Sequence, residues 1–172
     1  IKLVSFKFIM IKIGLTGSIA SGKTTASKII SRKKGPLFSA DEVVKKIYIK
    51  DSFKKLVSKK LNFHLSTNFK KKVKTKILQK SKNLKKLEKI IHPLVRKKMF
   101  IFLKKHKNRK FLFFEIPLLI ESKLTKHFDA LIFIKAKKSL RLKRYKLKGG
   151  NTRLFLLLNK QQFKDTKKMN FC

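Results

Sequence analysis

The residues with the clearest chemical meaning form a glycine-rich stretch near the start of the chain. Residues 17–24 read GSIASGKT and satisfy the pattern GxxxxGK[ST], with Gly17, Gly22, Lys23 and Thr24 at its defining positions. In such a loop the backbone N–H groups surround phosphates, the lysine contacts phosphate oxygens and the hydroxyl binds Mg²⁺. The pattern therefore predicts a phosphate-binding loop (P-loop).

The elements expected on either side support this prediction. Residues 11–15 are apolar and predict a buried strand, whereas small and apolar residues recur at helical spacing from Lys23 to Arg32. A strand that enters the loop and a helix that leaves it direct N–H groups and the positive helix end toward the phosphates. The alternative, a chance glycine turn, accounts for neither the full pattern nor its context.

Only eight acidic residues are available for catalysis or metal binding, so each can be weighed. Asp41 follows a short apolar segment at 37–40, and in a parallel sheet it would emerge at the same edge as the P-loop. There it could accept the proton of a phosphate-receiving hydroxyl, or cap the helix that follows, or both. Asp41 is therefore the first candidate for a general base.

The remaining acids give weaker signals. Glu115 ends the apolar segment FLFFEIP and could lie near Mg²⁺ or its water, with a plain strand-end acid as the alternative. Glu121 could contact substrate or lie on an exposed helix surface. Asp129 and Asp165 have no positional argument in their favour.

A basic segment, LRLKRYKLKGG, lies toward the end of the chain. Arg141, Arg144 and Lys148 fall at i, i+3 and i+7 and share one helical face, followed by a glycine pair that could act as a hinge. Such a face could close over the transferring phosphate as a lid, with coincidence in a lysine-rich chain as the alternative. His92, next to Pro93, could be structural or catalytic.

Composition limits the classes of protein that need to be considered. The chain has 172 residues, 42% of them hydrophobic, which fits one domain with a sizeable core. A formal charge of +40 suggests a polyanionic partner, but Lys far outnumbers Arg, and enrichment in Lys, Ile, Phe and Asn is typical of AT-rich genomes. The single cysteine, Cys172, excludes an internal disulfide and a cysteine-based zinc site.

No apolar run reaches the roughly 20 residues of a membrane span, and the start of the chain lacks a secretory cleavage site. We therefore expect a cytoplasmic protein with no membrane partner. The chain begins with Ile1, whereas Met10 directly precedes the first strand. We expect residues 1–9 to be a non-native or upstream extension and residues 10–172 to be one domain, truncated at its C-terminus.

Strand-like and helix-like segments alternate along the chain, which predicts a parallel α/β sheet. The expected strands are 11–15, 37–40, 111–116 and 130–134. Asn83 is expected to break the helix-rich middle, and Pro93 to begin a helix toward Leu103. Further helices are expected at 118–126, 139–148 and 152–163.

Together these segments resemble the dephospho-CoA kinase family. The similarity covers about residues 11–169 and rests on five segments in family order: GLTGSIASGKTTASKII, FSADEVV, LEKIIHPLVRKKM, EIPLLIE and LRLKRYKLKGG. Many kinases share the first, but SADEVV together with HPLV and PLLIE is much more specific. The resemblance implies a three-layer P-loop NTPase fold with a helical acceptor-binding part, about residues 50–108, and a lid, about residues 139–152.

The resemblance also implies a reaction and roles for individual residues. The reaction is phosphorylation of the ribose 3′-hydroxyl of dephospho-CoA by ATP and Mg²⁺, giving CoA and ADP. Asp41 matches the catalytic base and Arg144 a lid arginine. Residues matching the ATP-binding loop are Ala20, Ser21, Gly22, Lys23, Thr24 and Thr25, and those matching the acceptor side are His92, Pro93, Leu118 and Glu121. Lys148 is also expected to bind substrate.

The chain departs from the family pattern at three positions. Ser39 replaces an acid of the family's DAD-like motif, Ala20 replaces a glycine of the loop, and Lys148 replaces a lid arginine, losing the bidentate fork. The alternatives are a P-loop kinase of a nucleotide or small alcohol and, from a different class, a basic nucleic-acid-binding protein. Scattered lysines, few arginines and no recognised nucleic-acid module count against the second.

Overall fold

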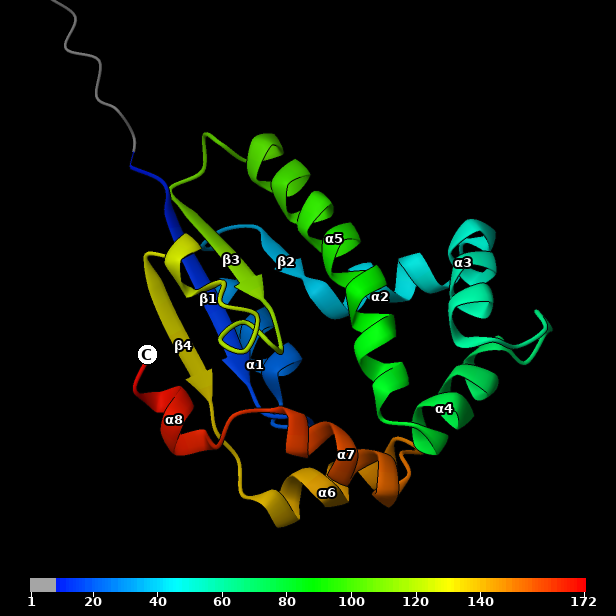
Figure 1. The fold of residues 1–172 in the computed structure, drawn as a ribbon. Coiled ribbons are helices and arrows are strands. Elements are labelled where there is room, and N and C mark those ends of the chain that lie inside the picture. Colours follow the sequence, from blue (N-terminus) through cyan, green and yellow to red (C-terminus); the bar gives the residue numbers. More distant parts are fainter. Residues whose placement is uncertain (1–8) are drawn as a thin grey trace, which may run out of the picture.

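A four-stranded parallel sheet forms the centre of the molecule in the computed structural model, which describes residues 9–172. The strand order is β2-β3-β1-β4, with the four strands nearly side by side in Figure 1. Their bounds are β1 Ile11–Gly17, β2 Leu37–Ser39, β3 Phe111–Glu115 and β4 Ala130–Ile134. Glu115 pairs in register with Leu15 on one side and Ser39 on the other, so β1, β2 and β3 all end at one edge. The expected α/β fold is confirmed.

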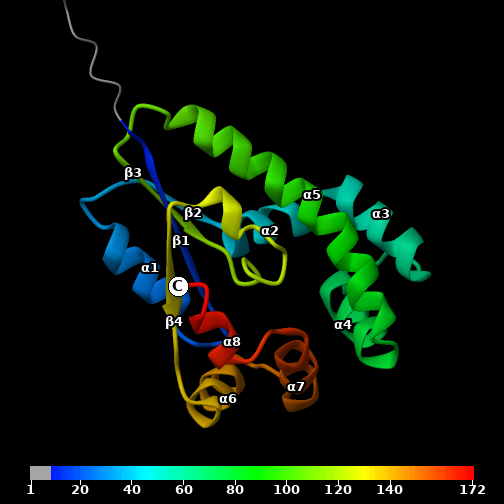
Figure 2. The same cartoon turned by 60° about the vertical axis from the view of Figure 1, so that its left-hand side comes forward.

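Helices cover both faces of the sheet, and Figure 2 shows α1 and α5 on opposite sides of the strands. This arrangement gives three layers. Beneath α5 the sheet presents Phe38, Leu112 and Phe114, which pack with Met99 of the helix. The helices are α1 Lys23–Ser31, α2 Ala40–Tyr48, α3 Asp51–Leu61, α4 Phe69–Gln79, α5 Lys82–Lys105, α6 Lys138–Leu147, α7 Thr152–Gln161 and α8 Asp165–Met169.

The middle of the chain differs from the expectation at two places. Pro93 does not begin a helix but lies inside α5. The helix continues through Pro93 because it is packed on both sides of this residue. Leu87, before Pro93, packs with buried residues of α2, α3 and α4, and Met99, after it, packs on the sheet. The break falls at residues 80–81, not at Asn83. The Asn83 Nδ2 amide instead donates to the Lys76 carbonyl oxygen (2.8 Å) near the end of α4.

Two further local predictions are wrong. Residues 118–126 form turns followed by a short 3₁₀ helix, Thr125–His127, because Leu119 and Ile120 turn inward and are buried against the sheet. Asp41 does not cap α2. Ser39 takes that place, its Oγ accepting from the Glu42 N–H at 3.4 Å, and α2 therefore begins one residue before Asp41.

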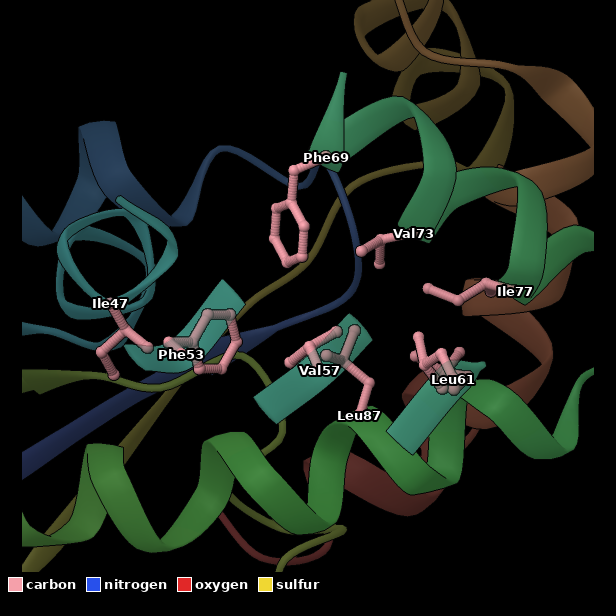
Figure 3. Packing of buried hydrophobic residues seen from close by; sticks show 9 residues of the cluster. Ile47, Phe53, Val57, Leu61, Phe69, Val73, Ile77 and Leu87 are labelled. Carbon is pink, nitrogen blue, oxygen red and sulfur yellow. The ribbon is translucent and has the colours of Figure 1, made fainter. Parts of the chain in front are cut away.

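Nine buried residues of α2, α3, α4 and α5 form a second core beside the sheet, eight of them labelled in Figure 3. The segment expected at about 50–108 thus contains α3, α4 and α5, and α5 also packs on the sheet through its second half. None of the helices in residues 9–172 is long and apolar enough to cross a bilayer. The extension expected at residues 1–9 lies, except for Ile9, outside the described part of the chain.

The helical core should depend on Leu87, which is 4% exposed and faces Val57 and Leu61 in Figure 3. We expect Leu87→Ala to lower the free energy of unfolding by about 2–5 kcal/mol, because it removes buried apolar volume and leaves a cavity. Denaturant unfolding followed by circular dichroism measures this change. The neighbouring exposed Lys86→Ala should alter it by less than about 0.5 kcal/mol. Equal small effects from both variants would contradict this packing.

Candidate active site

The P-loop connects the end of β1 to the start of α1 and needs small residues at defined points. A Cβ on Gly17 would lie 2.4 Å from the Ile134 carbonyl oxygen of β4, so a side chain there would clash with backbone. Gly22 has φ +98°, a conformation that favours glycine. Ala20 also has a positive φ, 59°, so the position at which this chain departs from the family pattern adopts a left-handed conformation without glycine.

The polar side chains of Lys23 and Ser21, both in the loop, are buried. Lys23 is 7% exposed, and its Nζ donates to the Ser18 carbonyl oxygen at 3.0 Å. Burial lowers the pKa of Lys23, while Asp41 and Glu115 act in the opposite direction. The Ser21 Oγ is buried and has no hydrogen-bond partner among residues 9–172. Because buried polar atoms are normally paired, this hydroxyl fits a loop built for an anion.

Glu115 occupies the centre of the site and is fully buried. Its Oε1 accepts from the Thr24 hydroxyl at 2.6 Å and its Oε2 from the Ser39 hydroxyl at 2.9 Å. One carboxylate therefore joins β3, the start of α1 and the end of β2. Thr24 and Glu115 also bring two oxygen ligands of the kind that Mg²⁺ prefers close together. Residues 9–172 contain no cluster of three or more acidic, histidine or cysteine side chains suited to a metal.

Asp41 lies in the first turn of α2, immediately after β2. The residue is exposed to solvent at the surface of the site. Nearby protein atoms still remove part of the water around its carboxylate, and this desolvation raises the pKa of Asp41. Lys23 lowers this pKa and Glu115 raises it, in smaller measure. A carboxylate with a raised pKa accepts a proton more readily than an ordinary aspartate, which suits a general base.

The largest cavity described, about 690 Å³, opens beside the P-loop. Arg144 and Lys148 of the expected lid line it opposite the loop, and the Arg144 Nη1 donates to the Ser21 carbonyl oxygen at 3.2 Å. Arg141 does not line this cavity: it is 5% exposed, and its Nη1 donates to the Asn159 Oδ1 of α7 at 2.8 Å and lies 3.4 Å from the Ile19 carbonyl oxygen. The predicted face of three cations therefore supplies two to the cavity.

A second cavity, about 220 Å³, lies between α2, α5 and the segment after β3. Its lining is mainly apolar, and it includes His92 and Leu118 from the predicted acceptor side. Asp41 lines both this cavity and the one beside the P-loop. The candidate base thus stands where a phosphate donor in the first cavity would meet an acceptor in the second.

The structure distributes the other predicted acceptor residues differently. Pro93 is exposed on α5 and does not line the second cavity, because it points away from His92 around the helix. The Glu121 Oε1 is held by the Phe163 N–H (3.0 Å) and the Lys168 Nζ (2.8 Å), although Glu121 also lines a neighbouring hollow with His92. Contact of either residue with a substrate remains a prediction.

Sequence reasoning missed two charged residues of the second cavity, Glu88 and Arg96. Burial raises the pKa of Glu88, whereas burial and, to a lesser extent, Arg96 lower the pKa of His92. The three side chains repeat every four residues along α5 and so share one helical face. That spacing was visible in the sequence and could have revealed them.

Comparison with known proteins agrees with this geometry. The family model for dephospho-CoA kinase matches residues 11–170, which include the P-loop, both cavities and the lid segment. The chain belongs to the dephospho-CoA kinase family. The Bartonella henselae dephospho-CoA kinase is 33% identical over 161 residues, covering 91% of this chain and 83% of that protein. The Rickettsia typhi dephospho-CoA kinase is 36% identical over 139 residues, covering 78% and 70%.

Solved structures show the same fold. The dephospho-CoA kinase from Campylobacter jejuni is 25% identical, with a TM-score of 0.60 and coverage of 95% of this chain and 86% of that one. A crystal structure from Thermus thermophilus has a TM-score of 0.75 at 22% identity, covering 94% and 84%. Membership of the dephospho-CoA kinase family thus accounts for the five sequence segments and for the three-layer sheet.

Within this dephospho-CoA kinase fold, Lys23 should contribute strongly to nucleotide binding. We expect Lys23→Met to weaken ATP affinity by about 100-fold, because a buried charge-assisted contact to phosphate is lost. Isothermal titration calorimetry measures the affinity. Lys28→Met, on the same helix but exposed and outside the cavity, is the matched control and should bind ATP normally. Full ATP affinity in the Lys23 variant would contradict the loop assignment.

Proposed function

We propose that the chain catalyses the reaction of its family, transfer of the γ-phosphoryl group of ATP to the ribose 3′-hydroxyl of dephospho-CoA. The observation that carries the proposal is the position of Asp41, which lines both the P-loop cavity and the apolar cavity between α2 and α5. A phosphate donor and a hydroxyl acceptor can therefore meet at one carboxylate. Such positioning accounts for much of the catalysis of phosphoryl transfer.

In the proposed reaction Asp41 accepts the proton of the 3′-hydroxyl as its oxygen bonds to the γ-phosphorus. The bond between this phosphorus and the β,γ-bridging oxygen breaks, and ADP leaves with the bonding electrons. Lys23 binds the phosphate oxygens, and Arg144 and Lys148 approach from the lid side of the cavity. Their charges stabilise the negative charge that spreads over the transferring group.

The proposal includes Mg²⁺ bound beside the P-loop. The Thr24 hydroxyl would ligate it and Glu115, 2.6 Å from that hydroxyl, would orient a ligand water or bind directly. When bound, Mg²⁺ neutralises phosphate charge and polarises the oxygens of the transferring group. Phosphate oxygens and water would supply its other ligands, since Mg²⁺ usually takes only one or two protein ligands.

The acceptor would enter the helix-lined cavity. Leu118 and the apolar residues of α5 supply a surface for its uncharged portions, while His92 and Arg96 provide polar contacts at one wall. Because the pKa of His92 is lowered, this imidazole is neutral at pH 7 and can accept a hydrogen bond as well as donate one.

The proposal also places the protein in the cytoplasm.

Replacing Asp41 by asparagine tests the base. We expect Asp41→Asn to lower kcat by about 10²–10⁴-fold, because the amide cannot accept the hydroxyl proton in the transition state. ATP affinity should change by less than about twofold, since the amide keeps the size of the side chain. Steady-state kinetics and calorimetry on the same preparation separate the two quantities.

Glu42→Gln is the matched control, because this neighbouring acid is exposed and pairs with Lys45 at 2.6 Å. It should retain normal turnover. In the unsubstituted protein kcat/KM should rise with pH through a midpoint above 3.8, the value of an unperturbed aspartate, as Asp41 loses its proton. Normal turnover in Asp41→Asn with ATP binding intact would remove Asp41 from the base role.

A further inference from the structure

The first half of the P-loop is bound by side chains from the last third of the chain. The Ser18 hydroxyl donates to the Asp165 Oδ1 at 2.6 Å, and the Ile19 N–H donates to the Gln162 Oε1 at 2.8 Å. From α6 the Arg141 Nη1 approaches the Ile19 carbonyl oxygen at 3.4 Å. These contacts span more than 120 positions of sequence, and the motif of the loop does not predict them.

Gln162 and Asp165 are themselves held in place from the other side. They flank Phe163, whose N–H donates to the Glu121 Oε1 at 3.0 Å. The same oxygen lies 2.8 Å from the Nζ of Lys168, which is 0% exposed. The buried ion pair therefore fixes residues 162–168 between the turn after β3 and the P-loop. In Figures 1 and 2, α8 lies beside the carboxyl end of β4 and close to α6.

Buried cations are concentrated in this region. Within residues 9–172 the buried Lys and Arg side chains are Lys23, Arg141 and Lys168. Lys23 and Arg141 contact P-loop carbonyl oxygens, and Lys168 anchors the segment that carries Gln162 and Asp165. Most of the chain's basic residues are exposed, so the burial of these three indicates a specific arrangement around the loop.

We infer that Gln162 and Asp165 are positioning residues that hold Ser18 and Ile19 so that the loop is ordered before nucleotide binds. Gln162 accepts from the N–H just before the loop residues that match the ATP site, Ala20–Thr25. Of the later N–H groups, that of Ser21 donates to the Ser18 carbonyl oxygen at 3.1 Å. The first N–H groups of α1 lack intrahelical acceptors and are available to phosphates. Ordering the loop in advance strengthens binding because less conformational entropy is lost when the ligand arrives.

This inference deepens the proposed function, since it concerns the nucleotide half of the same site. It does not depend on which hydroxyl is phosphorylated, because ATP affinity can be measured without an acceptor. Failure of the acceptor assignment would leave the nucleotide result unchanged. Failure of the positioning role would in turn leave turnover with dephospho-CoA intact.

The test uses the full chain and ATP as the probe. Gln162→Met keeps the length of the side chain but removes the acceptor for the Ile19 N–H. We expect its ATP dissociation constant and its KM for ATP to rise about tenfold, about what one hydrogen bond contributes. The kcat and the KM for dephospho-CoA should stay within about threefold.

A pair of variants at Asp165 separates positioning from a general structural role. Asp165→Asn keeps an acceptor for the Ser18 hydroxyl and should bind ATP within about twofold of the unsubstituted chain, whereas Asp165→Leu should weaken binding about tenfold. Thr166→Ala, exposed on α8 next to Asp165, is the matched control and should change nothing. Hydrogen exchange of the peptide containing Ser18 and Ile19 should accelerate in Gln162→Met and Asp165→Leu only.

Three results would overturn the inference. The first is unchanged ATP affinity in Gln162→Met and Asp165→Leu. The second is an equal loss of ATP affinity in Asp165→Asn and Asp165→Leu. The third is an equal loss of ATP and dephospho-CoA affinity, which indicates general loosening. If Gln162→Met fails to fold, the Asp165 pair alone decides between these outcomes, because Asn and Leu both keep the branching of the aspartate side chain at Cγ.

Discussion

The buried carboxylate of Glu115 is the constraint on which the site depends. An ionised group excluded from water is costly unless its oxygens are bonded, and here each oxygen accepts from a hydroxyl, Thr24 on α1 and Ser39 at the end of β2. The two bonds fix the separation between the P-loop and the end of β2, from which the chain continues to Asp41 in the first turn of α2. The carboxylate thus relates the nucleotide half of the site to the acceptor half.

Ser39 illustrates how a departure from the family pattern is absorbed. Its single hydroxyl donates to Glu115 at 2.9 Å and accepts from the Glu42 N–H at 3.4 Å, so it both caps α2 and supports the central carboxylate. A hydroxyl can do both because it carries a donor and acceptor lone pairs. One acid fewer at this edge also reduces the negative charge next to bound phosphates. Asp41 remains the acid that faces the two cavities.

The P-loop and the parallel sheet were predictable from sequence because both follow from local patterns. A glycine-rich loop between an apolar strand and a helix has few conformations, and alternating strands and helices imply a parallel sheet. Sequence reasoning therefore placed Lys23, Thr24, Asp41 and Glu115 at one edge correctly. Arg144 of the predicted lid also reaches the loop, whereas Arg141 of the same predicted face does not line the cavity.

The features that sequence did not reveal depend on tertiary contacts. A proline inside a helix normally kinks or ends it, because one backbone hydrogen bond is lost. At Pro93 the packing of α5 against two separate cores outweighs this loss. Asp165 and Gln162 carry no motif, and their partners in the P-loop lie more than 140 positions away. The sequence allows a substrate contact for Glu121, whereas in the structure its carboxylate forms a buried ion pair with Lys168.

In the proposed mechanism the two cavities that share Asp41 bring ATP and dephospho-CoA together. This is tested by ADP release from ATP with dephospho-CoA, AMP or no acceptor, with the product identified by mass and its new phosphate located by ³¹P NMR. We expect ADP and CoA in equal amounts, with a 3′-phosphate, and almost no ADP otherwise. The mechanism would be contradicted if ADP were released at the same rate with AMP as the acceptor, or if ADP were released without any acceptor and no CoA were formed.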